Sequence, residues 1–317
     1  MLRLILLRLG TAVVTVWLAS LFVFIAVQAL PGDVAQQILG QDATPEAVAA
    51  LREKLGLNEP IISRYFSWLG GMVTGDMGTS LVSGEPVADT LLTHARNTLM
   101  IAIPTIILGI TLSIVLGLLA GLYRDRTTDR TISGLALVGM SIPEFVTATV
   151  LVLVFAIAIP IFPAVVIDGA EARVADLLPF TILPVIVLTI SMAAYIIRMT
   201  RAGVIDALAS EFVTTAQLKG VKPGRVVLRH ALPSAILPTL NVIAINVAWL
   251  IGGVVVVEAV FNYPGMGTLM IESVHNRDLP VIQAIAVLSA SVYALTNLAA
   301  DLVAMGLDPR QRAGRFH

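Results

Sequence analysis

Six apolar runs, each long enough to cross a lipid bilayer, constrain the fold of this chain more than any other feature. A helix rises about 1.5 Å per residue, so roughly 20 apolar residues cover the hydrocarbon core of a membrane. The first run is too long for the apolar part of a signal peptide and lacks a small-residue cleavage site, so we expect it to remain as a span. The runs predict an all-α membrane protein with six transmembrane helices, at Gly10–Leu30, Thr98–Leu122, Ile132–Ile159, Leu177–Ile197, Ile236–Phe261 and Val281–Met305.

The supply of charged residues is too small for a soluble protein of this length. Charged residues make up 13% of the 317 residues, against roughly 25% in a soluble globular domain. A soluble fold would lack the charge to cover its surface, so much of the surface must face lipid or other protein. The sequence contains no cysteine, which excludes disulfides and thiolate metal sites from it.

Basic residues fall unevenly on the two sides of the predicted spans. With the N-terminus placed inside, fourteen of the 20 Lys and Arg residues lie on the inner side and six on the outer side. Four of those six lie in one long loop, where the positive-inside rule has little force. The distribution predicts that both termini are cytoplasmic, and an even number of spans agrees with this orientation.

The segment 31–97, between the first two spans, is longer than a connection needs to be, and its pattern predicts a helical external insertion. Thr44 is a typical N-cap with Pro45 at the first helical position, and Gly56 is expected to end that helix. A second short helix is expected over Pro60–Leu69, with aromatic residues near its end. The insertion either caps the first span or docks an external partner, and the sequence favours the cap.

The segment between the fourth and fifth spans predicts a short capped helix, near residues 210–222, on the cytoplasmic side. Ser210 is suited to cap its N-terminus, and Glu211 in the first turn suits the positive end of the helix dipole. Lys219 in the last turn suits the negative end, and Gly220 can adopt the left-handed conformation that ends many helices.

The role of this short helix stays open on physical grounds. Lys222, Pro223 and Gly224 are expected to turn the chain directly after it. A helix held in this way is either a rigid element that a soluble partner can push or an amphipathic helix resting on lipid head groups. The local pattern alone does not separate the two.

The same stretch contains a spaced set of residues, namely Thr214, Thr215, Ala216 and Gly220, followed by Leu232 and Pro233. It resembles the signature of ATP-binding-cassette (ABC) importer permeases, in which Glu-Ala-Ala is followed by Gly and later by Leu-Pro. The acidic residue and first Ala of the general pattern are absent here. Glu211, three residues earlier, is similar to the dipeptide/oligopeptide/nickel branch of these permeases.

Further motifs of this branch occur in the expected order along the chain. Any one match is weak, but the ordered set is specific and runs from the first span to the tail. The matches are Ala29–Asp33, Leu55–Leu57, Trp68–Gly70, Gly75–Leu81, Glu258–Phe261, Tyr263–Gly267, Arg277–Asp278 with Pro280, and Leu307–Arg310.

The resemblance implies a type I ABC importer fold and a permease subunit in the bacterial inner membrane, without a cofactor. It divides the chain into a first span within 1–30, the insertion 31–97 and a five-helix core over 98–317. The implied partners are a second homologous permease, two ABC ATPase subunits and an extracytoplasmic solute-binding protein, with no nucleic acid. Peptides are the commonest cargo of the branch, and relatives carry glutathione, nickel chelates, opines or sugars. The implied ATPase-coupling residues are Ser210, Glu211, Phe212, Thr214, Thr215, Ala216, Lys219, Gly220, Pro223 and Gly224.

The sequence predicts no enzymatic chemistry of its own. A Walker-type phosphate loop needs Gly-Lys followed by Ser or Thr, and none of the lysines, Lys54, Lys219 and Lys222, follows a glycine. ATP hydrolysis is therefore expected on a partner chain. The four histidines are scattered, with no pair at metal-ligand spacing on a helix, so no metal site is predicted.

Polar residues inside the predicted spans are candidates for the translocation path, namely Glu144, Asn241, Asn246 and Glu258. Glu144 follows Pro143 part-way along its span, and a mid-membrane carboxylate could serve as a proton relay. The alternative function is therefore a secondary transporter or channel that uses Glu144. No cationic partner lies in the same span, so the importer is the preferred interpretation. Packing between helices is the other role open to the asparagines.

Overall fold

Most of the described chain is helical. The structure, a computed structural model, describes residues 2–29, 36, 43–54, 58–167 and 169–307. Within these residues the strand pairing is limited to one isolated bridge between Thr79 and Pro86. The helices are α1 Leu2–Gln28, α3 Pro45–Lys54, α4 Ile61–Thr74, α5 Val87–Leu122, α6 Thr127–Ser141, α7 Glu144–Val152, the π-helix η1 Leu153–Ala158, α8 Val174–Leu208, α9 Glu211–Leu218, α10 Pro223–Val226, the π-helix η2 Val227–Ala231, α11 Leu232–Phe261, α12 Met266–Asn276 and α13 Leu279–Leu307.

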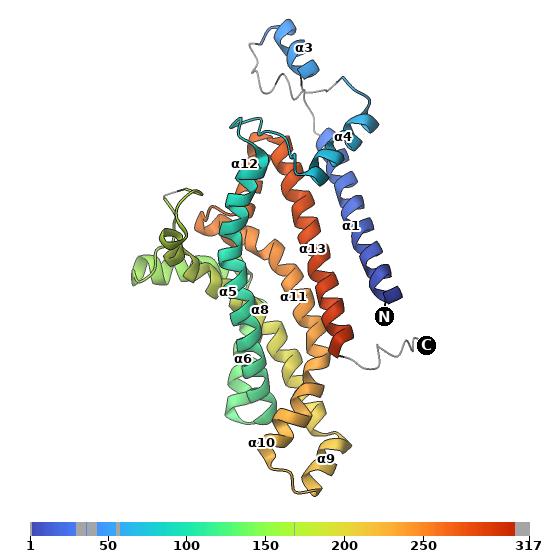
Figure 1. The fold of residues 1–317 in the computed structure, drawn as a ribbon. Helices are drawn as coiled ribbons and strands as arrows, with labels where there is room; N and C mark the ends of the chain where they lie inside the picture. Colours follow the sequence, from blue (N-terminus) through green and yellow to red (C-terminus); the bar gives the residue numbers. More distant parts are fainter. Residues whose placement is uncertain (1, 30–35, 37–42, 55–57, 168, 308–317) are drawn as a thin grey trace.

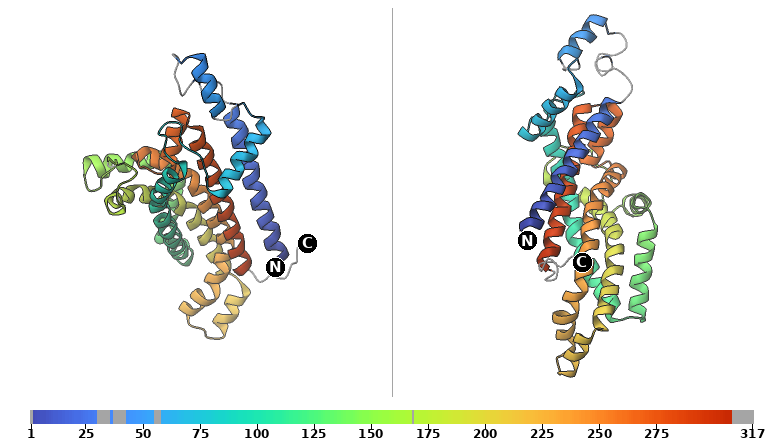
Figure 2. Two further views of the ribbon diagram at one scale, coloured as in Figure 1. Left: turned by 45° about the horizontal axis from the view of Figure 1, so that its top comes forward. Right: turned by 90° about the vertical axis from the view of Figure 1, so that its right-hand side faces the viewer.

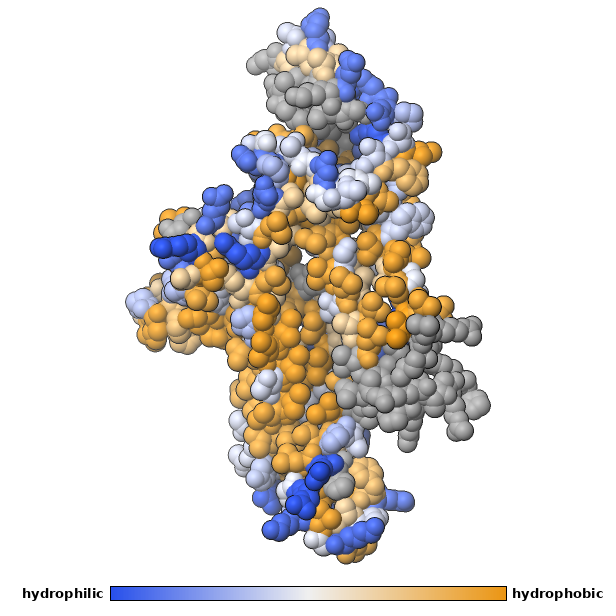
Figure 3. Space-filling model, viewed as in Figure 1, coloured by the Kyte–Doolittle hydropathy of each residue, from blue (hydrophilic) through white to orange (hydrophobic). Residues whose placement is uncertain are grey.

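Long apolar helices make up the middle of the molecule. Four of the described helices, α1, α5, α8 and α13, are individually long and apolar enough to cross a membrane. Three bent helix pairs pass the same test together, so the described residues allow up to seven spans. Figure 3 shows apolar residues covering the middle of the molecule, with polar residues gathered toward its two ends. The predicted all-α membrane fold is confirmed, whereas the exact number of spans stays a prediction.

Four of the six predicted spans correspond to the single helices α1, α5, α8 and α13. The fifth, Ile236–Phe261, lies within α11, which begins four residues earlier and contains Pro238. The chain bends by 54° between 223–236 and 238–250, because a proline inside a helix removes one backbone hydrogen bond and crowds the preceding turn.

The third predicted span, Ile132–Ile159, is wrong as one continuous helix. The structure divides it into α6 and the pair α7–η1, which meet at an angle of 101°. Pro143 explains the break, because proline disfavours a helical conformation in the residue before it and has no N–H to donate. Ile142 is accordingly extended, with φ −94° and ψ 123°. Residues 144–158 project sideways from the bundle (Figure 1).

The helices α5 and α8 pack closely against each other. A Cβ atom added to Gly117 of α5 would lie 2.5 Å from the Cβ atom of Thr200 and 2.9 Å from the carbonyl oxygen of Ile197, both on α8. These distances are shorter than van der Waals contact, so the helices approach closely only because the residue is glycine. On α8, Leu188 and Met192 are completely buried.

The insertion 31–97 contains the two predicted helices. Thr44 caps α3, since its side-chain oxygen accepts a hydrogen bond from the N–H of Ala47 at 3.3 Å. The predicted end of this helix at Gly56 lies outside the described residues. The second helix, α4, begins at Ile61, one residue after the predicted start at Pro60, and continues to Thr74, beyond the predicted end at Leu69.

Aromatic residues hold α4 against α1, in agreement with the interpretation of the insertion as a cap. The hydroxyl groups of Tyr65 and Ser20 are 2.9 Å apart. The ring of Phe24 lies 5.3 Å from the ring of Tyr65 and 5.6 Å from that of Trp68. The insertion lies at one end of the molecule, and α9 and α10 lie at the opposite end (Figures 1 and 2).

Candidate functional site

The short helix α9 protrudes from one end of the bundle, where it follows α8 and precedes α10 (Figure 1). Val213 and Ala216, three residues apart on one face of α9, are buried. They belong to an apolar cluster that also includes Val204 of α8, Val226 of α10 and Ala231 of η2. Because its inner face packs on these three helices, α9 is fixed to the end of the bundle.

The C-terminus of α9 has the predicted glycine cap. Gly220 has a φ angle of +72°, in the left-handed region that favours glycine. Its N–H donates to the carbonyl of Gln217 at 2.9 Å, and the N–H of Val221 donates to the carbonyl of Ala216 at 3.2 Å. These two bonds form a Schellman motif, which satisfies carbonyl groups that the helix end would leave unpaired.

Three local predictions around α9 differ from the structure. Ser210 is the N-cap residue, but its hydroxyl donates to the carbonyl of Ala207 at 2.5 Å and makes no capping bond. Lys219 is the C-cap residue and lies just beyond the last turn. Pro223 and Gly224 begin α10, so the expected turn there is the start of a helix, which suits proline because the first turn needs no N–H donor.

The outer face of α9 contains an exposed apolar residue that the sequence reasoning missed. Glu211, Thr214, Thr215 and Leu218 are exposed and have the i, i+3, i+4, i+7 spacing of one helical face, opposite Val213 and Ala216. Leu218 is 85% exposed, and Phe212 beside this face is 46% exposed. An apolar side chain left uncovered on a rigid, capped helix is typical of a contact surface for another molecule. The spacing of the apolar residues Val213 and Ala216 could have identified Leu218 from the sequence, because it predicts which face of α9 packs on the bundle and which face is exposed.

Among the predicted path residues, Glu144 lies where α7 meets α11. It is half-buried, and a Cβ atom on Gly253 of α11 would lie 3.0 Å from its Oε2 atom. This oxygen is buried and has no hydrogen-bond partner among the described residues. Asn246 lies seven residues before Gly253, on the same face of α11, and its amide donates to the carbonyl of Val242 at 2.8 Å. Asn241 is exposed on another face.

Glu258 is completely buried in a separate hydrogen-bond network at the corner between α11 and α12. Its carboxylate accepts from the hydroxyl of Thr98 at 2.6 Å and from the N–H of Gly267 at 2.7 Å. The oxygen of Thr98 in turn accepts from the N–H of Met266 at 2.8 Å. The network thus fixes the 79° bend after α11 against α5. The structure brings Glu144 close to the Asn246 face of α11, but Glu258 has different surroundings.

Replacing Glu258 with Leu is expected to destabilise the folded protein, because the N–H of Gly267 and the hydroxyl of Thr98 lose their acceptor. Each buried donor left unpaired costs about 1–3 kcal/mol. Glu258→Gln is expected to be milder, since an amide oxygen can accept from Gly267 while its NH₂ group donates to Thr98. The measurement is the midpoint of thermal unfolding in detergent. Equal midpoints for Glu258→Leu and the unchanged protein would contradict this role.

These features define a helical membrane protein with a short, capped helix at one end and a helical insertion at the other. The chain belongs to the family described as "Binding-protein-dependent transport system inner membrane component", whose model matches residues 113–313. Residues 1–102 match the model described as "Binding-prot-dependent transport system membrane comp, N-term". The resemblance to importer permeases is therefore confirmed, and the chain is a membrane component of a transport system.

Individual relatives agree with this family. The chain is 36% identical over 305 residues to a probable peptide ABC transporter permease protein of Sinorhizobium fredii, covering 96% of this chain and 97% of the relative. It is 34% identical over 312 residues to the glutathione transport system permease protein GsiC of Escherichia coli, covering 98% and 99%. The fold is similar to a chain of the inward-facing MetNI methionine ABC transporter, with a TM-score of 0.56, 18% identity, and 69% of this chain and 96% of the other covered.

Proposed function

We propose that this chain is a permease subunit of an ATP-driven importer of peptides or similar small solutes, and that α9 is its ATPase-coupling helix. The observation that carries the proposal is the two-sided character of α9. Val213 and Ala216 anchor one face to the bundle, while Leu218 on the other face is 85% exposed. Glu211, Thr214 and Thr215 surround Leu218, so a groove in a separate ATPase subunit would receive one apolar side chain within a polar ring, as in many protein interfaces.

The proposed complex contains a second, homologous permease, two ABC ATPase subunits and an extracytoplasmic solute-binding protein. Membership of a binding-protein-dependent family supports the last partner. The names of the two similar relatives, a peptide permease and a glutathione permease, support a peptide-type cargo. A translocation path between two such permeases would place Glu144 and Asn246 near the solute.

We propose six crossings of the inner membrane with both termini in the cytoplasm. In this arrangement 1–30 contains the first crossing, 31–97 is the external insertion, and 98–317 contains the other five. The excess of basic residues on the side that includes α9 supports the orientation. It places the coupling helix where cytoplasmic ATP is available.

The loops around Gly75–Arg96 and Asn262–Pro280, two external segments that also contain the start of α5 and the whole of α12, are the proposed contact surface for the binding protein. Ser80 of the first loop donates a hydrogen bond to Asp278 of the second. The N–H of Leu81 donates to the other carboxylate oxygen of Asp278 at 3.1 Å. Asp278 is 4% exposed. These bonds join the loops into one surface, which supports a common partner.

The test of the complex is purification of this chain in detergent from its native membrane, followed by mass spectrometry of the proteins that accompany it. We expect an ABC ATPase subunit and a second permease, and a captured binding protein would lead to the substrate. If the chain purifies alone and still moves solute in vesicles without ATP, the importer proposal is wrong.

A secondary transporter or channel that uses Glu144 is the second candidate function. The observation that favours it is the buried Oε2 atom of Glu144, which has no hydrogen-bond partner within the described part of the chain. A carboxylate in this position could bind and release a proton during transport.

Replacing Glu144 with Gln separates the two candidate functions. For an importer, we expect ATP-driven uptake by vesicles that hold the complete complex to change little, because the side chain keeps its size and ATP supplies the energy. For a proton-coupled transporter, uptake would be almost completely lost. Glu171→Gln, which neutralises an exposed carboxylate before α8, is the matched control. Loss of uptake with Glu144→Gln alone, together with dependence on a proton gradient, would favour the second function.

A further inference from the structure

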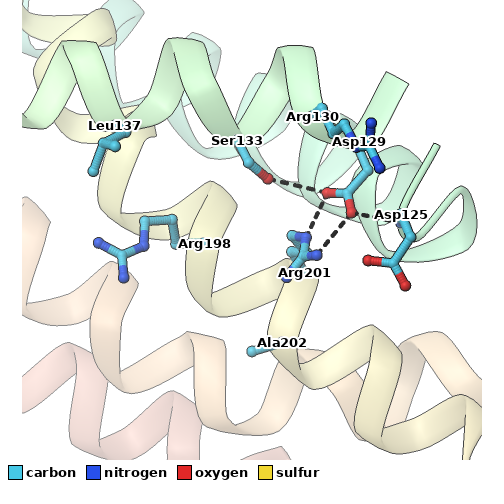
Figure 4. Close-up of a pocket in the computed structure, with 8 residues that line it drawn as sticks. All are labelled: Asp125, Asp129, Arg130, Ser133, Leu137, Arg198, Arg201 and Ala202. Carbon is cyan, nitrogen blue, oxygen red and sulfur yellow. Dashed lines mark hydrogen bonds and ion pairs between the residues drawn. The ribbon is translucent and has the colours of Figure 1, made fainter. Parts of the chain in front are cut away.

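A polar cleft lies between α6 and α8 (Figure 4). The start of α6, where the cleft lies, is toward the end of the bundle that carries α9 (Figure 1). The volume of the cleft is about 500 Å³. Three arginines line it, Arg130 from the first turn of α6 and Arg198 and Arg201 from neighbouring positions on α8. We call it the arginine cleft.

One arginine of the cleft already has an acidic partner. Arg201 donates two hydrogen bonds to Asp129, from Nε to Oδ1 at 2.5 Å and from Nη2 to Oδ2 at 2.7 Å. Asp129 also accepts from the hydroxyl of Ser133 at 3.0 Å and the N–H of Asp125 at 2.9 Å. Both oxygens of Asp129 are therefore occupied, and the carboxylate is almost completely buried. The pair fixes α6 and the connection before it to α8.

The other two arginines of the cleft lack an acidic partner. In the part of the chain that the structure describes, no carboxylate lies within 4.0 Å of the guanidinium group of Arg130 or Arg198. Asp125, the second acid of the cleft, pairs with Arg124 at 3.4 Å. Since Asp129 pairs with Arg201 and Asp125 with Arg124, the uncompensated positive charge of the cleft is on Arg130 and Arg198.

The cleft borders on apolar surface. Leu137 and Ala202 line it together with the charged residues, and Figure 4 shows Leu137 beside Arg198, at the end away from Asp129. Leu137 is 55% exposed, and Tyr195, three residues before Arg198 on the same face of α8, is 47% exposed. A ligand that fits both the unpaired arginines and the apolar border carries a negative group and an apolar part.

We propose that the arginine cleft binds the phosphate group of an anionic phospholipid. Arg130 and Arg198 are its ligands, and the acyl chains lie along the exposed apolar residues of α6 and α8. The inference rests on the membrane orientation given above, which places the cleft at the cytoplasmic head groups. Basic clefts between transmembrane helices on this side hold acidic lipid head groups, and guanidinium groups match phosphate oxygens in geometry.

Two other anions share part of this chemistry. Free phosphate would satisfy the arginines but would leave Leu137 and its neighbours uncovered, and an acidic side chain of another subunit would do the same unless apolar residues accompany it. The phospholipid accounts for both the unpaired charge and the apolar border, and the free anion and the subunit contact are outcomes of the test.

The test is native mass spectrometry of the chain purified with its partners, titrated separately with phosphatidylglycerol, phosphatidylcholine and inorganic phosphate. We expect saturable binding of phosphatidylglycerol, weaker binding of phosphatidylcholine and no binding of phosphate at the same concentrations. The double substitution Arg130→Gln and Arg198→Gln is expected to weaken binding of phosphatidylglycerol at least about tenfold, because each basic residue near an anionic head group contributes roughly fivefold. Both arginines are exposed, so the variant should fold.

The matched control is the double substitution Arg225→Gln and Arg229→Gln, which removes the same charge from exposed residues of α10 and η2, outside the cleft. We expect it to change binding far less. Equal losses for the two pairs would show diffuse attraction and overturn the site. Equal binding of inorganic phosphate would identify a soluble anion as the ligand. Loss of a subunit from the Arg130/Arg198 variant, with no lipid bound by the unchanged protein, would identify a protein contact. None of these readouts depends on ATP hydrolysis, so the lipid site can fail while the importer proposal holds.

Discussion

Replacing Leu218 with Asp is expected to reduce ATP-driven uptake at least about tenfold, the effect of losing a central interface residue. The side chain is 85% exposed in this chain, so its replacement removes no internal packing and the amount of inserted protein should not change. In a complex, however, the new carboxylate would be buried on the same face of α9 as Glu211, and burial of a charge is costly. Uptake by vesicles containing the complete complex, and the amount of ATPase that co-purifies, are the measurements.

Two variants of α9 control for general effects. Leu218→Met keeps an apolar side chain of similar volume and should retain uptake. Gln217→Asp places the same charge one residue away, on the flank of α9, and should have a smaller effect. If Leu218→Asp transports normally with its ATPase bound, the outer face of α9 does not couple the two subunits.

Replacing Gly117 with Leu is expected to prevent α5 and α8 from packing, and so to reduce the amount of folded protein severely. The Cβ atom alone would lie 2.5 Å from the Cβ atom of Thr200 and 2.9 Å from a backbone oxygen of α8. Two helices that meet along most of their length cannot separate at one point without losing neighbouring contacts. Overpacking a core typically costs about 1–3 kcal/mol, and more where backbone must move. The measurement is the quantity of protein that elutes as a single species in detergent.

Gly134→Leu is the matched control for this substitution. Gly134 lies in α6, and a Cβ atom there meets nothing within 4 Å. We expect this variant to accumulate almost as well as the unchanged protein. Gly117→Ala should fall between the two, since it adds only the first atom of the side chain. Similar yields for Gly117→Leu and Gly134→Leu would contradict the close approach of α5 and α8.

Local features of the fold could be predicted from the sequence because neighbouring residues determine them. The cap of α3 by Thr44 and the left-handed Gly220 depend on bonds that span only a few residues. The hydroxyl of Ser210 was predicted less well, because it can rotate between the N–H groups ahead of it and the carbonyl of Ala207 behind it. The break at Pro143 was missed because hydropathy continues through it although the helix does not.

Features that depend on distant residues could not be predicted in this way. Glu258 accepts a hydrogen bond from Thr98, which lies 160 positions earlier in the chain. The residues near Glu258 in the sequence therefore do not predict that it is buried. The same holds for Asp129, whose partner Arg201 is 72 positions away. The exposure of Leu218 depends on how α9 settles on α8, α10 and η2. Tertiary contacts of this kind decide which polar residues are structural and which are available to a partner.

The connection between α8 and α9 determines how movement travels through the molecule. Only Ala209 and Ser210 separate the two helices, and the bond from Ser210 to the carbonyl of Ala207 restrains them. Because the connection is short and restrained, we expect a displacement of α9 to move α8 as well. The 35 residues of α8 form one helix that contains Pro179 and Pro184, and a helix of this length spans about 52 Å. A rotation of about 10° around one end of a helix of this length shifts the other end by about 9 Å, so a small angular change at the end that carries α9 becomes a displacement of several ångströms at the opposite end of α8.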